Sequence, residues 1–352
     1  MDSRLILAVL LKAGVKPNCM TYGNPQSRDV ILAREIAKRF GLNFHNACQD
    51  PPNKDWYFKW AVETIKCDDG NSHLHRAHRM AAIVEHFEIY HPKVLFTGHM
   101  GGEGMRRFKY NDYLTSKFFE WVNEGKKSIQ EAIVTILDDY FINPGIVHLD
   151  ELIEMIRHLP WMKHDKNTNI FFFLYEFDAK IHHSQDLRLY NKYVPNVVPV
   201  FLQYDYLKVI FSSKYNFISK NDNVFQRLMN PELYCRIINE IYPPLMNFPF
   251  SNGYAPSEYM KGLWYYIPAK LYHDLTKKRK YPVSFPYGEW YADFILEHSR
   301  NISPEFWEIY DKKRYMEEID INKHNTEEGY WHKFSNPIFF DLVKKYKEGK
   351  LN

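Results

Sequence analysis

The chain has 352 residues, of which 45% are hydrophobic, 25% charged and 17% aromatic, with a formal net charge of +3. This length and composition predict a globular protein with a sizeable core, and the small net charge gives no support for nucleic acid as a partner. The four cysteines form no C-x-x-C pair, which favours reduced thiols over disulfides. The apolar run at residues 5–11 is too short to span a membrane. We therefore expect a cytoplasmic protein.

The first hundred residues alternate between helical and strand patterns. Apolar residues from Leu5 to Leu10 predict a helix over residues 2–13, and those from Val30 to Ala37 predict an amphipathic helix over 27–40. Strands are predicted at 17–22, 42–46 and 93–97 (the last one buried), and further helices at 56–66 and 72–90. Because helices and strands alternate with short connections, we expect an α/β fold with a parallel sheet and helices on both faces.

The pattern becomes mostly helical from about residue 111. Helices are predicted at residues 115–124, 128–141, 149–159, 169–182 and 231–242. Prolines predict turns between helices at residues 143–144, 195–199 and 243–244. The sequence therefore predicts an α/β region over residues 1–110 and a mainly helical region over residues 111–352.

Asp2 and Ser3 stand at the start of the first predicted helix. A helix N-terminus presents free backbone N–H groups and a positive dipole end, which suit a phosphate group. An aspartate at this place can also hold Mg²⁺ on a pyrophosphate, because hard cations prefer carboxylate and phosphate oxygens. The alternative is that either residue only caps the helix.

A glycine-rich loop follows the predicted strand at residues 93–97. Four glycines and Glu103 lie within residues 98–104, a pattern that lets the backbone approach a ligand closely. Glu103 is a candidate carboxylate for metal or substrate, or else a solvated residue in a turn. Ligands of parallel sheets bind at the carboxyl ends of the strands. We therefore expect this loop and Tyr22-Gly23 at one edge, facing the helix that starts at Asp2.

Several motifs together resemble one known family. M-D-S-R-L-I-L-A at residues 1–8, T-Y-G at 21–23 and T-G-H-M-G-G-E at 97–103 resemble, in order and spacing, the synthetase domain of glutamine-hydrolysing asparagine synthetases. These belong to the N-type ATP pyrophosphatases, or PP-loop proteins. N-F-P-F at 247–250 is similar to the family's P-F-L-D element, and F-P-Y-G-E-W at 285–290 to its final P-x-x-x-W element.

This resemblance implies a Rossmann-like fold of the adenine nucleotide alpha hydrolase type. The start of the chain is similar to the end of the family's pyrophosphate loop, S-G-G-x-D-S-R, with Met1 on the variable position. The first strand and the two phosphate-cradling glycines would then precede Met1, as in an N-terminally truncated member.

The resemblance also implies a cofactor site. Asp2 and Ser3 would lie at the pyrophosphate and Mg²⁺ of ATP. The same comparison places the following residues around the nucleotide: Tyr22, Gly23, Gly98, Gly101 and Gly102.

A second set of residues is implied for catalysis. Glu103 falls on the acidic end of the family's second loop and is a second candidate for Mg²⁺. The family uses a lysine after P-F-L-D to neutralise charge at the phosphates, for which Lys270 is the first candidate and Lys261 the second.

The implied reaction is the adenylation of a carboxylate by MgATP, followed by attack of ammonia. The acceptor would be aspartate or a related acid, and an alternative is a sugar or secondary-metabolite carboxylate. Ammonia would come from a separate glutaminase subunit or from solution. A further alternative is a catalytically inactive remnant that acts as a binding or scaffold protein, because Gly102 replaces the usual aspartate of the second loop. The sequence leaves open whether the protein is a homo-oligomer.

A histidine-rich segment is the last candidate. His75 and His78 lie three residues apart and would share a helix face. They predict either a polar face lining the acceptor pocket or, alternatively, a transition-metal site.

Overall fold

The computed structural model describes the following residues: 2–47, 52–68, 77–102, 110, 114–213, 215, 231–250, 253–276, 285–325 and 327–351. The chain forms two compact units, each built from three segments. The first unit comprises residues 1–52, 82–108 and 190–285, and the second comprises residues 53–81, 109–189 and 286–352. One crossing between units, at residues 108/109, lies next to the boundary predicted near residue 110. The division into 1–110 and 111–352 stays a prediction.

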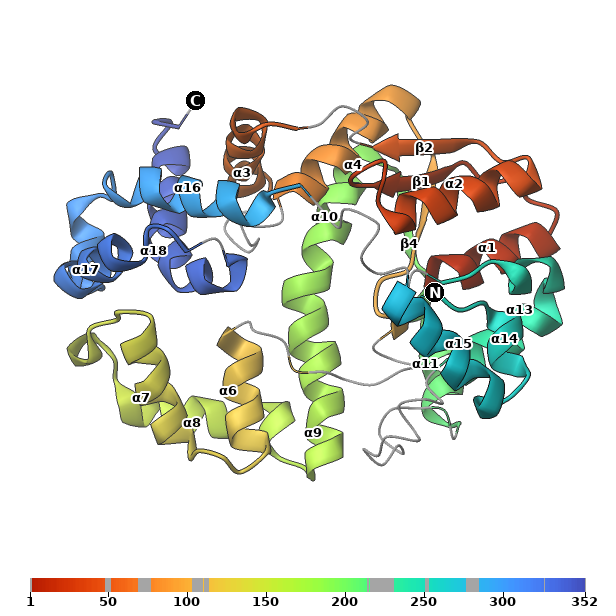
Figure 1. Cartoon of the computed structure of the whole chain (residues 1–352). Helices are drawn as coiled ribbons and strands as arrows, with labels where there is room; N and C mark the ends of the chain where they lie inside the picture. Colours follow the sequence, from red (N-terminus) through yellow and green to blue (C-terminus); the bar gives the residue numbers. More distant parts are fainter. Residues whose placement is uncertain are drawn as a thin grey trace. The chain divides into compact units, whose positions relative to one another are not determined.

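The first unit begins with a helix and a parallel pair of strands (Figure 1). Its elements are α1 (Asp2–Lys12), β1 (Cys19–Tyr22), α2 (Arg28–Phe40) and β2 (Phe44–Ala47). β1 and β2 are parallel, with Cys19 opposite Phe44 and Tyr22 opposite Ala47. Helix α2 ends at Gly41, whose φ of 62° is the left-handed conformation that favours glycine. The four elements predicted over residues 2–46 are thus confirmed.

A second parallel pair joins β3 (Val94–Thr97) to β4 (Asn196–Pro199), with Val94 opposite Asn196. The turn predicted at residues 195–199 is therefore wrong: Val197 and Val198 favour a strand, and Pro199 at its end needs no N–H partner. The predicted burial of β3 is also wrong, since Val94 and Phe96 are 45% and 43% exposed. Within the described ranges the two pairs remain separate and form no single sheet.

The rest of the first unit is helical. Its elements are α4 (Ala77–Tyr90, which continues across residues 81/82), η5 (Val200–Leu202), α11 (Tyr204–Phe211), α13 (Glu232–Ile241), η6 (Pro243–Asn247), α14 (Pro256–Met260) and α15 (Leu263–Thr276). Leu5 and Ile6 of α1 pack in a buried cluster with Tyr234 and Ile238 of α13 and with Leu245. Burial of this apolar face holds α1 in place, so the position of its first turn is set by segments far along the chain.

The second unit is built from helices. Its elements are α3 (Lys54–Asp68), α6 (Leu114–Asn123), α7 (Ile129–Asp139), η2 (Pro144–Ile146), α8 (Leu149–Arg157), η3 (Pro160–Met162), α9 (Lys166–Phe172), the π-helix η4 (Phe173–His183), α10 (Ser184–Tyr193, which continues across residues 189/190), α16 (Tyr287–Ser299), η7 (Pro304–Glu308), α17 (Lys312–Asn322) and α18 (Glu328–Lys347). Its core is aromatic: Phe119 stacks on Phe173 at 4.1 Å between ring centroids. In the described part of the chain, no helix has the length and apolarity to cross a membrane.

Candidate functional site

The first turn of α1 lies directly against the loop of residues 98–102, which we call the glycine loop. A methyl group added at Gly98 would lie 3.1 Å from Asp2 Cβ and 3.4 Å from the Ser3 backbone nitrogen. One added at Gly101 would lie 2.9 Å from Asp2 Cγ and 2.8 Å from the ring of Phe201. At Gly101 a Cβ would force its neighbours to move, and at Gly98 it would require a small shift, so glycine at both positions favours the close approach of the loop to α1. The structure thus brings together Asp2, Ser3, Gly98 and Gly101.

The backbone of the glycine loop is strained. Met100 is 1% exposed and has a φ of 63°, a left-handed conformation that residues other than glycine rarely adopt. The Gly101 N–H donates to the Gly98 carbonyl at 3.2 Å and closes a tight turn. This turn fixes the loop backbone beside Asp2.

Tyr234 of α13 joins α1 to the glycine loop. Its hydroxyl lies 2.5 Å from Asp2 Oδ1 and 2.7 Å from the carbonyl oxygen of Gly101. The side chain is fully buried. No motif singles out Tyr234 in the sequence, because its apolar spacing with Ile238 indicates only a core position. It is the residue of this site that sequence reasoning missed.

Arg4 attaches the segment 247–250 to the same helix. Its guanidinium donates to the carbonyl oxygens of Phe248 and Pro249 at 2.5 and 2.7 Å, and lies 4.6 Å from the ring centroid of Phe250. Burial lowers the pKa of Arg4 to about 10, and nearby Cys235 opposes this shift. The N-F-P-F element that resembles P-F-L-D is therefore bound to the helix that begins with Asp2.

Cys235 is a buried free thiol next to Arg4. Burial raises the pKa of its thiol to about 12, and the positive charge of Arg4 only partly opposes the shift. Because the thiolate is the reactive form, Cys235 serves as a core residue.

Polar groups also lie at the carboxyl ends of the strands. Tyr22 is 39% exposed at the end of β1, and Gly23 follows with a φ of 116°. Asn46 of β2, 3% exposed, donates to the Gly23 carbonyl at 3.3 Å. The structure thus places Tyr22 and Gly23 at the predicted strand end.

The two candidate lysines lie in neighbouring helices of the first unit. Lys270 is half-buried in α15. Lys261 caps α14, and its ammonium lies 4.4 Å from the ring centroid of Tyr265. The choice between them stays a prediction. Gly102 is buried next to Gly101, and Glu103 lies outside the described residues.

The donor set at α1 suits a metal bound through a nucleotide. Within the described ranges, no group of three His, Cys, Asp or Glu side chains could hold a metal ion. Mg²⁺ in nucleotide sites commonly uses one or two carboxylates together with phosphate oxygens, and Asp2 supplies one such carboxylate. A metal ion here would need the phosphate oxygens of a bound nucleotide beside Asp2, and the donor set is compatible with that arrangement.

The structure describes only His78 of the predicted histidine pair. His78 stacks on Tyr287 in the second unit, with ring centroids 3.9 Å apart and planes at 17°. His75 lies outside the described residues, so the predicted pair stays a prediction. Tyr287 and Trp290, from the element that resembles P-x-x-x-W, pack with Tyr57 in an aromatic cluster.

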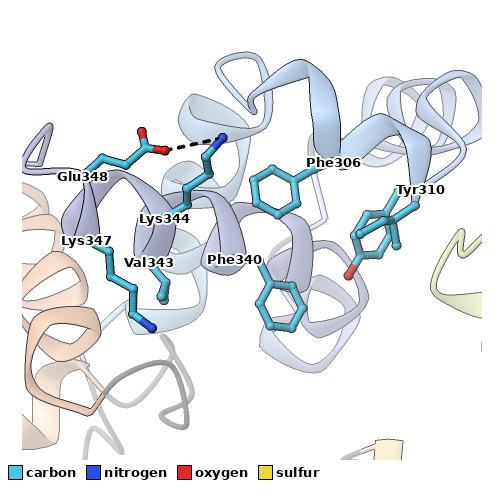
Figure 2. Close-up of a pocket in the computed structure, with 8 residues that line it drawn as sticks. Phe306, Tyr310, Phe340, Val343, Lys344, Lys347 and Glu348 are labelled. Atoms are coloured by element: carbon cyan, nitrogen blue, oxygen red, sulfur yellow. Dashed lines mark ion pairs between the residues drawn. The ribbon is translucent and has the colours of Figure 1, made fainter.

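The second unit carries an open groove of about 570 Å³ on α18 (Figure 2). It is lined by Phe306, Ile309, Tyr310, Phe340, Val343, Lys344, Lys347 and Glu348. Lys344 at its edge pairs with Glu305 and with Glu348. The lining is mainly apolar, with the charged residues Lys344, Lys347 and Glu348 beside the aromatic ones.

Comparisons with protein-family models, with curated proteins and with solved structures found no match to this chain. The resemblance to asparagine synthetase therefore depends on the order and spacing of the motifs, and the function drawn from it is a proposal.

Proposed function

We propose that the first unit binds ATP with Mg²⁺ at the N-terminal end of α1 and uses it to activate a carboxylate for amide formation. An oxygen of the acceptor carboxylate attacks the α-phosphorus, and the bond to the bridging oxygen breaks as pyrophosphate leaves with the electron pair. Ammonia then attacks the acyl carbon and AMP departs. The observation that carries the proposal is the close approach of Gly98 and Gly101 to Asp2 and Ser3.

This approach supports phosphate binding for two reasons. The first turn of a helix has backbone N–H groups without intrahelical partners and a positive dipole end, and the glycine loop adds backbone without side-chain bulk next to it. Asp2 would hold the metal ion, which when bound neutralises charge on the phosphates. Catalysis would then consist mainly of positioning and charge neutralisation.

The remaining roles follow the same chemistry. A lysine ammonium would stabilise the leaving pyrophosphate, with Lys270 as first candidate and Lys261 as second. The two parallel strand pairs are separate among the described residues, and a Rossmann-like sheet that contains both is part of the proposal. The acceptor is aspartate or a related acid, and ammonia comes from a glutaminase subunit or from solution.

A non-catalytic binding protein is the second candidate. The observation that favours it is Gly102, which stands where the resembled family has an aspartate in its second loop. Loss of a metal-binding carboxylate at this place would weaken the chemistry while leaving the fold intact.

ATP–pyrophosphate exchange tests the choice between these two functions. The full chain is incubated with MgATP and labelled pyrophosphate, with aspartate, glutamate, sugar acids or amino-substituted carboxylic acids offered in turn. We expect exchange that requires one class of acid. No exchange with any acid, in a sample that shows helical circular dichroism and cooperative unfolding, would favour the binding protein. Exchange without any acid would contradict the activation of a carboxylate.

A further inference from the structure

The contacts of Tyr234 carry an inference that rests on the proposed function and extends it. The two groups that meet at its hydroxyl are far from it in sequence: 232 residues separate Tyr234 from Asp2 and 133 separate it from Gly101. Tyr234 itself is 0% exposed and packs in the core cluster with Leu5 and Ile6 of α1. A fully packed ring leaves its hydroxyl little freedom to move, so this oxygen is a fixed point between α1 and the glycine loop.

The proton count at this point matters. A phenol carries one proton, while an ionised Asp2 carboxylate and the Gly101 carbonyl are both acceptors. Only one of the two oxygens can therefore receive the Tyr234 proton at a time. The hydroxyl can bond Asp2, or it can turn its proton to Gly101 when Asp2 is engaged elsewhere. Either arrangement keeps one of the two segments attached to α13.

We infer that Tyr234 is a positioning residue for the nucleotide site. Before nucleotide binds, its proton alternates between the Asp2 carboxylate and the Gly101 carbonyl, so each segment is bonded to α13 for part of the time. The hydroxyl retains Gly101 when Asp2 engages the metal-bound phosphates. Tyr234 thus couples capture of a magnesium nucleotide at α1 to the ordering of the glycine loop, and it touches neither substrate nor metal itself.

The test compares Tyr234→Phe with Tyr254→Phe. Tyr254 is also buried in the first unit, at 2% exposure, but packs against Phe250 and Tyr266. Hydrogen exchange measured by mass spectrometry without nucleotide reports only on the hydrogen bonds of the Tyr234 hydroxyl to Asp2 and Gly101. We expect amides of the glycine loop and of the first turn of α1 to exchange at least about tenfold faster in Tyr234→Phe, and at the wild-type rate in Tyr254→Phe.

Kinetics supply the second readout. In ATP–pyrophosphate exchange, Tyr234→Phe should raise the Mg²⁺ concentration that gives half-maximal rate and lower kcat/KM for ATP by about tenfold or more. Unchanged glycine-loop exchange and unchanged Mg²⁺ dependence in folded Tyr234→Phe would overturn the inference. If the wild-type chain shows no pyrophosphate exchange at all, the proposed function fails, whereas the hydrogen-exchange result still decides whether Tyr234 tethers the loop.

A pair of Asp2 variants tests the same bond from its other end, should Tyr234→Phe fail to fold. Asp2→Asn keeps an acceptor oxygen for the Tyr234 hydroxyl, while Asp2→Ala removes it. We expect the first turn of α1 to stay protected in Asp2→Asn and to lose protection in Asp2→Ala, where the Tyr234 hydroxyl donates to the Gly101 carbonyl instead. Equal protection in both variants would contradict the inference.

Discussion

The two units of this protein differ in the groups that they bring together. In the first unit, α1, the glycine loop and α13 meet so closely that no Cβ fits at Gly101, and polar groups converge there. The second unit has an aromatic core and, on α18, an open groove with a mainly apolar lining. Convergence of backbone and carboxylate, rather than the presence of a groove, identifies the candidate site.

The largest expected effect comes from Asp2. Asp2→Asn should lower the rate of acid-dependent ATP–pyrophosphate exchange by about 100-fold or more, because it removes the carboxylate charge that would hold Mg²⁺ on the phosphates. Asp29→Asn is the matched control, since Asp29 stands exposed in the first turn of α2 in the same unit. It should leave the rate within about twofold of wild type. Equal loss in both variants would contradict a specific role for Asp2.

The second effect tests the close approach at the glycine loop. Gly101→Ala should lower the free energy of unfolding by about 1–3 kcal/mol, because the new Cβ meets the buried ring of Phe201 and Asp2 Cγ. Gly329→Ala in the second unit has open space around its Cβ and lies in α18. It should raise the free energy of unfolding by about 0.5–1 kcal/mol. Urea unfolding of both variants measures the contrast, and a stable Gly101→Ala would show that the loop can move.

A third prediction concerns pH in the first unit. Burial, with a smaller effect of His45, lowers the pKa of His86 to about 4, and His86 is 8% exposed between His45 and Tyr90. The unfolded chain binds a proton at His86 more readily than the folded chain does. The contribution of neutral His86 to the free energy of unfolding is therefore complete above the unfolded pKa, and it is lost as the pH falls toward the folded pKa. Between about pH 7.5 and pH 5 the loss is about 2 kcal/mol.

The variant His86→Leu isolates this contribution. Its free energy of unfolding should fall less than that of wild type over the same pH range, and the difference between the two proteins is the measured quantity. Identical pH dependence in urea unfolding would show that His86 does not titrate with folding.

The smallest effect is expected in the groove of the second unit. Phe340 is 47% exposed there, so Phe340→Ser should cost less than about 1 kcal/mol of unfolding free energy. Pyrophosphate exchange should stay at the wild-type rate. Loss of pyrophosphate exchange in a stably folded Phe340→Ser protein would show that the groove takes part in catalysis. It would contradict the difference proposed between the two units.

Much of the candidate site could be predicted because its signals are local. Apolar spacing gave α1 and α2, and the rule that ligands bind at carboxyl ends of parallel strands led to the expectation that the glycine loop faces Asp2. The structure brings Gly98 and Gly101 against that residue. The N-F-P-F segment was recognised as a motif, but its attachment to Arg4 depends on carbonyl positions that no pattern encodes.

Other features depend on tertiary contacts and had no local signal. Pro195 and Pro199 indicate a turn, yet pairing with β3 makes a strand of residues 196–199. Tyr234 has the spacing of an ordinary core residue, and only the packing of α13 on α1 places its hydroxyl between Asp2 and Gly101. The interleaving of three segments in each unit likewise follows from long-range packing.

Hydrogen exchange with and without MgATP tests the central claim most directly. The account predicts that MgATP slows exchange in the first turn of α1 and in the glycine loop, while amides of α18 around Phe340 and Val343 exchange at the same rate in both samples. No change at α1 at millimolar MgATP, or protection that appears in α18 instead, would contradict a nucleotide site at Asp2.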